Sequence, residues 1–246
     1  MVSLALALAF MATGCAADKA IRQKQGRAAR DLGERYLARN ESSRALEQFL
    51  KSLEIYPEDP YLHYDLALTY DMKGKLDKVE EHLQEAIRLK PDYSDAYNYL
   101  GLVYFRQGRV DEAIEAYNNA LDNLLYLNPQ DAHLNLGVAY LSQKKYQKAK
   151  IHLQEALRLV PDFVGAHNSL GKTYEGLGQY DKAKISYLQA IKFNPEYADA
   201  YLNLGKLYYR SGERQKAIKA FDKVIRLDPG SDNAREALRY LRALGK

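Results

Sequence analysis

Residues 197–229 read YADAYLNLGKLYYRSGERQKAIKAFDKVIRLDP, and this stretch decides the fold. Its first half places Gly205 three residues before Tyr208, and its second half places Ala217 four residues before Phe221. Residues three or four apart lie on one face of an α-helix, so each half is expected to form a helix with one packing face. The stretch therefore predicts a pair of antiparallel helices.

The same pattern recurs along the chain from residue 26 onward. Each unit ends with a proline, which cannot donate the next helical hydrogen bond and pushes the preceding residue out of the helical region. These prolines are separated by 34, 38, 32, 34 and 34 residues: Pro57, Pro91, Pro129, Pro161, Pro195 and Pro229. In each unit a Leu-Gly or Leu-Ala pair is followed, three residues after its Gly or Ala, by a tyrosine: Tyr36, Tyr70, Tyr104, Tyr140, Tyr174 and Tyr208. A period near 34 resembles the tetratricopeptide repeat.

The resemblance implies an all-α fold, a right-handed α-solenoid of six tetratricopeptide repeats with a C-terminal capping helix. The expected repeats are 26–59, 60–93, 94–129, 130–163, 164–197 and 198–230, and the expected capping helix is 231–246. The small residue before each tyrosine is expected to let the second helix of the pair approach closely. Four glycines are expected to form the turns between paired helices: Gly74, Gly108, Gly178 and Gly212. Stability should come from stacking of neighbouring repeats.

The first fifteen residues, MVSLALALAFMATGC, carry an apolar run over residues 4–11. This run is shorter than the roughly twenty apolar residues that a membrane-spanning helix needs, so it indicates an export signal. The small residues before Cys15 resemble a bacterial lipobox. That resemblance implies a signal peptide over residues 1–14, an acyl (palmitate) anchor on Cys15, and outer-membrane sorting because Ala16 follows. An ordinary secretory signal and an apolar tail on a cytosolic protein are the alternatives.

Residues 15–25 are expected to form a lipidated cysteine and a basic linker, and the run of bases continues to Arg30. Such a run can lie against anionic headgroups or can simply be solvated. The whole chain has 36 basic and 32 acidic residues, a formal charge of +4. This charge is too small and too evenly distributed to predict binding to nucleic acid.

The residue pattern predicts a protein without catalytic, cofactor or metal sites and without a small-molecule substrate. One cysteine cannot form an internal disulfide or a zinc site of familiar spacing. No Ser-His-Asp order and no glycine-rich phosphate loop is present in the sequence. Three of the five histidines take the place of a packing aromatic residue: His63, His133 and His167. The other two, His82 and His152, share one place on the second helices and are expected to face outward.

In the tetratricopeptide family the first helices line a concave groove that binds protein partners. The corresponding positions in repeats two to four form a mostly apolar set: Tyr61, Tyr64, Leu68, Met72, Asn98, Leu102, Phe105, Leu134, Val138 and Leu141. In repeats five and six they form a polar and net basic set: Asn168, Lys172, Glu175, Lys206, Tyr209 and Arg210, with Asn203 adjacent. An exposed apolar patch of this extent indicates binding of an amphipathic or hydrophobic partner segment. The alternative is that neighbouring helices or the basic linker cover these residues.

The 38-residue interval is the main irregularity, and the second helix of repeat three is expected to run from 113 to 127. This extension, the six repeats, the cap and the lipobox resemble the type IV pilus biogenesis and stability lipoproteins, or pilotins. The resemblance implies an outer-membrane-anchored periplasmic protein that helps the pilus secretin to reach the membrane and oligomerise. Two other functions remain possible: a lipoprotein adaptor for envelope proteases or peptidoglycan enzymes, and the repeat arm of a glycosyltransferase.

Overall fold

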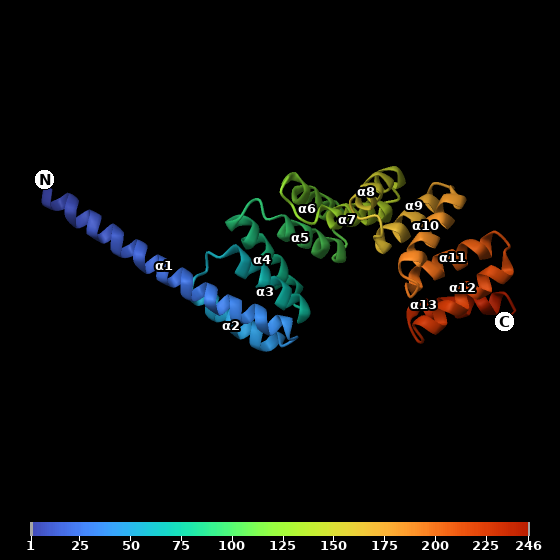
Figure 1. Ribbon diagram of the computed structural model, residues 1–246, viewed down its shortest axis with the longest axis horizontal. Helices are drawn as coiled ribbons and strands as arrows, with labels where there is room; N and C mark the ends of the chain where they lie inside the picture. Colours follow the sequence, from blue (N-terminus) through green and yellow to red (C-terminus); the bar gives the residue numbers. More distant parts are fainter. Residues whose placement is uncertain (1, 246) are drawn as a thin grey trace. The chain divides into compact units, whose positions relative to one another are not determined.

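The computed structural model describes residues 2–245, and their side chains from residue 18 onward. Thirteen helices joined by short connections make up this described part of the chain (Figure 1). The all-α prediction is therefore confirmed. The chain divides into two compact units, residues 1–107 and 108–246, with the boundary between the two helices of repeat three. Within the described residues, no helix is both long enough and apolar enough to span a bilayer.

The N-terminal unit contains five helices. They are α1 (Val2–Ala38), α2 (Ser42–Ile55), α3 (Pro60–Met72), α4 (Leu76–Leu89) and α5 (Ser94–Arg106). The C-terminal unit contains eight helices. They are α6 (Val110–Asp122), α7 (Pro129–Ser142), α8 (Tyr146–Leu159), α9 (Val164–Gly176), α10 (Tyr180–Phe193), α11 (Ala198–Arg210), α12 (Arg214–Leu227) and α13 (Asp232–Ala243).

The close approach of paired helices depends on the small residue in the first helix. A Cβ atom at Gly33 would lie 2.4 Å from the Phe49 ring, and one at Gly171 would lie 2.4 Å from the Tyr187 ring. Gly205 stands in the same relation to Phe221, at 2.7 Å. In repeat two, Ala67 takes this place and the partner is Leu83, which belongs to the same buried cluster. In the three helix pairs with glycine the second helix places an aromatic ring against the first helix, and the first helix has glycine there because the ring fills the space that a side chain would need.

The turns between paired helices use the left-handed backbone region. Gly74, Gly108, Gly178 and Gly212 have φ values of 68°, 79°, 72° and 73°, which confirms their predicted role. Repeats one and four place Asn40 and Lys144 there instead, with φ values of 62° and 57°. Asparagine tolerates this region better than most residues, whereas lysine adopts it at a cost.

The stretch predicted to be a linker is helical, because α1 runs without interruption into the first helix of repeat one. The segment packs on the end of α2: Lys19 pairs with Glu58 at 3.0 Å, and the Gln23 side chain lies 3.4 Å from the Tyr56 hydroxyl. Its alanines and long straight side chains favour helix. Cys15 lies in α1, but its side chain is outside the described ones.

The prediction of a longer second helix in repeat three is wrong. Helix α6 ends at Asp122, and residues 123–128 form a loop. The Asn123 side-chain oxygen accepts a hydrogen bond from the Leu125 backbone amide at 2.9 Å. Such local side-chain bonds compete with helical backbone bonds. The extra residues therefore present three leucines to solvent, at 96%, 84% and 89% exposure: Leu124, Leu125 and Leu127.

The predicted capping helix is α13. The Ser231 hydroxyl accepts a hydrogen bond from the Ala234 amide at 3.1 Å and so caps its first turn. Ala237 and Leu241 are buried in one cluster with Phe221 of α12. The exposed side of α13 carries charged residues, as expected of a helix that shields the last repeat from water.

Candidate partner-binding surface

The N-terminal unit presents a partly exposed aromatic and apolar surface on α3 and α5, which we name the tyrosine face. It consists of the predicted groove residues of these two helices: Tyr61, Tyr64, Leu68, Met72, Asn98, Leu102 and Phe105. Tyr61 and Met72 are 44% and 53% exposed, and the other five are half-buried. The face is therefore accessible mainly at its two ends on α3.

Aromatic contacts hold the tyrosine face in place. The Tyr61 and Tyr64 rings each lie 5.3 Å from the buried ring of Tyr93, which precedes α5. Tyr64 also meets Tyr99 of α5, with ring centroids 6.1 Å apart. These separations are those of favourable aromatic pairs. The rings are thus positioned by the packing of repeat two on repeat three and not by the surface alone.

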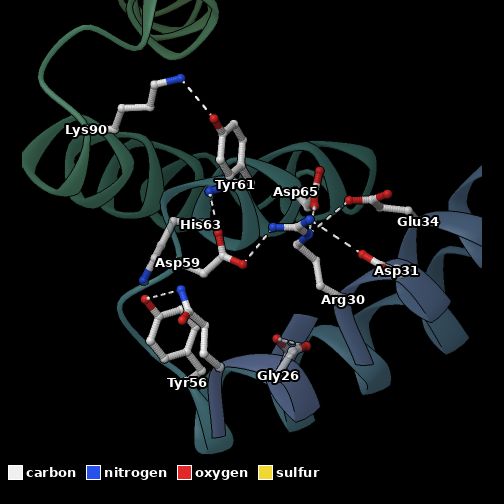
Figure 2. Close-up of polar contacts among 12 residues, drawn as sticks. Gly26, Arg30, Asp31, Glu34, Tyr56, Asp59, Tyr61, His63, Asp65 and Lys90 are labelled. Atoms are coloured by element: carbon white, nitrogen blue, oxygen red, sulfur yellow. Dashed lines mark hydrogen bonds and ion pairs between the residues drawn. The ribbon is translucent and has the colours of Figure 1, made fainter. Parts of the chain in front are cut away.

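One arginine organises the edge of the tyrosine face that borders α1 (Figure 2). The Arg30 guanidinium lies 2.6 Å from Asp59, 3.0 Å from Glu34 and 3.4 Å from Asp31. Asp59 is the N-cap of α3, and it also accepts the Tyr61 amide at 3.1 Å. Sequence reasoning treated Arg30 as the end of a basic run and missed this cluster, because Asp59 is 29 residues away along the chain.

A fourth carboxylate, Asp65, lies 4.0 Å from the Arg30 guanidinium. Its Oδ2 atom is buried and has no hydrogen-bond partner in the structure. Burial raises the pKa of Asp65 well above its usual value, the negative charge of Glu34 raises it further, and Arg30 opposes the change. Asp65 therefore keeps its proton to a higher pH than an ordinary carboxyl group.

Asp65→Asn is expected to raise the melting temperature at pH 7–8. The folded state keeps the Asp65 proton where the unfolded chain has lost it, so the stability that this group contributes below about pH 4 disappears as pH rises through its folded pKa. Asparagine has the same shape and does not ionise. Thermal melts at pH 4 and pH 8 test this: the gain should be present at pH 8 and absent at pH 4. Asp31→Asn, at an exposed carboxylate, is the control, and an equal gain there would contradict the assignment.

A second ion pair closes the opposite end of the tyrosine face. Asp71 accepts the Tyr99 hydroxyl at 2.6 Å and the Arg106 guanidinium at 2.8 Å. Burial opposes ionisation of Asp71, but the hydrogen bonds from Arg106 and Tyr99 keep its pKa below the usual value. Asp71 is thus a single carboxylate paired with one cation, whereas four carboxylates share the one cation Arg30.

In the C-terminal unit the predicted groove is less available. Leu134 and Leu141 pack against the buried cluster of α8 and α9, so both serve the core as well as the surface. Asn168 was expected to face a partner, but it is 4% exposed and its side-chain oxygen accepts a hydrogen bond from Asn203 at 2.9 Å. Asn168 is therefore a structural residue that links α9 to the half-buried Asn203 of α11.

The expected basic character of repeats five and six is also reduced. Lys206 pairs with Glu236 of the capping helix at 2.6 Å, and Arg210 pairs with Glu175. Val138 is half-buried, and Lys172 and Tyr209 are exposed. Internal ion pairs therefore offset much of the positive charge that the sequence places there.

The histidines form two pairs that sequence reasoning missed. His63 Nδ1 lies 3.0 Å from His82 Nδ1, and His133 Nδ1 lies 3.2 Å from His152 Nδ1. His82 is buried and His152 half-buried, so the prediction that both face outward is wrong. His63, His133 and His167 do occupy packing positions, and His167 stacks on Phe193. Across residues 18–245 no group of three or more His, Cys, Asp or Glu side chains could hold a metal ion.

Comparison with known proteins agrees with this architecture. Sequence models of the tetratricopeptide repeat match residues 48–81, 72–108, 92–162, 177–212 and 198–231. The type IV pilus assembly protein PilF of Pseudomonas aeruginosa is 28% identical over 165 residues, which cover 64% of this chain and 66% of PilF. The chain spans only 29% and 15% of two longer curated relatives.

Two solved structures of pilus proteins share the fold. The crystal structure of PilW, a type IV pilus biogenesis factor, has a TM-score of 0.79 and 23% identity, and the match covers 87% of this chain and 98% of that one. The structure of P. aeruginosa PilF has a TM-score of 0.77 and 24% identity, covering 89% and 99%. The chain belongs to the tetratricopeptide-repeat family of protein-interaction scaffolds, and its fold is similar to that of PilW and PilF.

Proposed function

We propose that this chain is a non-catalytic scaffold of type IV pilus biogenesis, anchored in the outer membrane through Cys15, that binds the pilus secretin subunit and supports its targeting and oligomerisation. The observation that carries the proposal is the likeness to PilW and PilF, which extends over 98% and 99% of the chains in their solved structures. The sequence similarity to PilF supports it independently.

The tyrosine face supplies the binding surface in this proposal. Its residues are exposed or half-buried on first helices, and no described helix covers Tyr61 or Met72. Aromatic and methionine side chains are typical anchors of protein interfaces. An adaptor for envelope proteases or peptidoglycan enzymes would use the same face, so the identity of the bound partner distinguishes these two functions.

The membrane anchor makes a separate prediction. Cys15→Ser is expected to move the protein from the membrane fraction to the soluble fraction of the cell envelope, because it removes the sulfur atom that would carry the lipid. Immunoblots of separated fractions measure the change. Ala16→Asp keeps the sulfur and, by the sorting rule that the lipobox resemblance implies, should shift the protein to the inner membrane. Unchanged fractionation of Cys15→Ser would exclude the lipid anchor.

A further inference from the structure

We propose that the tyrosine face accepts a partner segment in which apolar side chains are combined with a lysine or arginine, and that this cation lies beside Glu34 and Asp65. The inference rests on the proposed use of the tyrosine face as the docking surface. It specifies the chemistry of the partner segment, which the proposed function leaves open.

The charges at the α1 edge of the face are unbalanced. Four carboxylates surround Arg30. Even when Asp65 carries a proton, the other three carry three negative charges against the single positive charge of Arg30. The Glu34 and Asp31 side chains are 47% and 59% exposed, so a partner can reach them. A guanidinium or ammonium group makes its strongest hydrogen bonds to carboxylates. The missing partner at this edge is therefore a cation.

The aromatic rings of the same region already hold cations. The Lys90 ammonium lies 4.9 Å from the Tyr61 ring centre and 4.8 Å from that of Tyr93. The Arg30 guanidinium lies 5.5 Å from the Tyr61 ring. All three distances are within the range of favourable cation–π contacts. The tyrosine rings of this region thus attract cations, and Tyr61 is partly exposed between Lys90 and Arg30 (Figure 2).

The apolar part of the partner follows from the spacing along α3. Leu68 and Met72 lie three and seven residues after Asp65, which places all three on one face of the helix. Leu102 of α5 is half-buried and belongs to the same predicted groove. Asp71 and Arg106 neutralise each other at that end and leave no charge for a partner to match. A fitting segment therefore has its cation about one to two helical turns from its apolar anchors.

The test begins with a photo-crosslinking amino acid, p-benzoylphenylalanine, in place of Met72 in the full-length chain expressed in its own host. The same residue in place of Tyr180, which is exposed on α10 in the other unit, is the matched control. Mass spectrometry then identifies the partner residues joined to position 72. We expect an apolar segment with a lysine or arginine within about eight residues of the crosslink.

Charge exchange provides the second step. Glu34→Lys should lower the crosslink yield at least about fivefold, since it opposes the partner cation, and replacing that partner residue by glutamate should restore the yield. Glu47→Lys, at an exposed position on α2, makes the same change of charge away from this face and controls for a general effect of charge. Circular dichroism verifies that each variant is folded.

Three results would overturn the inference: no crosslink at position 72, a crosslinked segment without a basic residue, or an unchanged yield with Glu34→Lys. The proposed function is judged separately, by the identity of the captured protein. A basic and apolar segment from a protein unrelated to pili would refute the pilus role and leave the inference intact. A secretin segment without a basic residue would support the pilus role and refute the inference.

Discussion

Gly171→Ala is expected to destabilise the C-terminal unit by about 1–3 kcal/mol, the usual cost of overpacking. Alanine favours a helix over glycine by up to about 1 kcal/mol, so a helix-propensity argument alone predicts the opposite sign. The steric effect dominates because the new Cβ would lie 2.4 Å from the Tyr187 ring. That ring is fully buried, and the close packing of protein interiors leaves little room for it to shift. Urea denaturation followed by circular dichroism measures the change.

Two matched variants separate crowding from a general effect of alanine. Gly165 lies in the same helix, and a Cβ there would be 3.5 Å from Leu134, an ordinary contact, so Gly165→Ala should be neutral or stabilising. Gly137→Ala faces Leu153 and should cost less than Gly171→Ala, since repeat two already combines Ala67 with Leu83. A Gly171→Ala variant as stable as the parent protein would contradict the packing account.

The two histidine pairs are expected to contribute a loss of stability in both units as pH falls from about 6.5 to 4, while Asp65 acts in the opposite direction in the N-terminal unit. The Pro57 carbonyl can only accept, so His63 Nε2 carries a hydrogen and His63 Nδ1 accepts from His82. A second proton would leave two N–H groups facing each other. Burial, followed by the charge of His63, lowers the pKa of His82 to about 4, and burial also lowers the pKa of His133 and His152.

The sign follows from proton linkage. The unfolded chain binds these protons near pH 6.5 and the folded chain only at lower pH, so the stabilisation is complete above pH 6.5 and is lost on acidification. For His82 the loss by pH 4.5 is on the order of 2 kcal/mol. The nearby charges act in both directions: Glu81 and Glu85 favour protonation of His82, and Lys78 opposes it. At the second pair, Glu155 favours protonation, and Lys148 and Arg158 oppose it.

Replacing both second-helix histidines by serine, in the double variant His82→Ser and His152→Ser, tests this directly. Repeat five already has this arrangement, with Ser186 at the corresponding place. Loss of ring packing should lower stability at pH 7, and the difference from the parent protein should shrink as pH falls to 4.5. Comparing variant with parent removes the opposite contribution of Asp65. A difference that is constant with pH would refute the account.

The sequence was sufficient to predict the repeats because their determinants are local. Glycine at the turns and small residues opposite rings act within one helical pair, so their spacing appears directly in the chain. The Arg30 cluster was not predictable in this way, since Asp59 and Asp65 are 29 and 35 residues further along the chain, at the start of α3 and within it. The histidine pairs did leave a signal: His63 and His82, like His133 and His152, are nineteen residues apart.

The loop after α6 shows a different limit. Leucine and tyrosine at helical spacing indicate a longer helix, but the chain turns after α6, where the Leu125 amide donates to the Asn123 side chain and the Tyr126 amide donates to the Asn123 carbonyl. Burial of apolar residues requires a partner surface, and residues 124–127 have none within the described structure that covers the three leucines. Hydrophobicity alone therefore gave the wrong boundary.

The assembly state of the pilus secretin tests the central claim most directly. Leu102→Lys with Phe105→Lys places two charges on the tyrosine face, and Ile151→Lys with Ile185→Lys makes the same change at exposed positions on second helices. Secretin multimers are measured by gel electrophoresis of outer membranes from cells that express each variant, with circular dichroism to verify helical content. The account predicts loss of multimers in the first variant and normal multimers in the second. Normal multimers in the first variant, with its helical content intact, would contradict it.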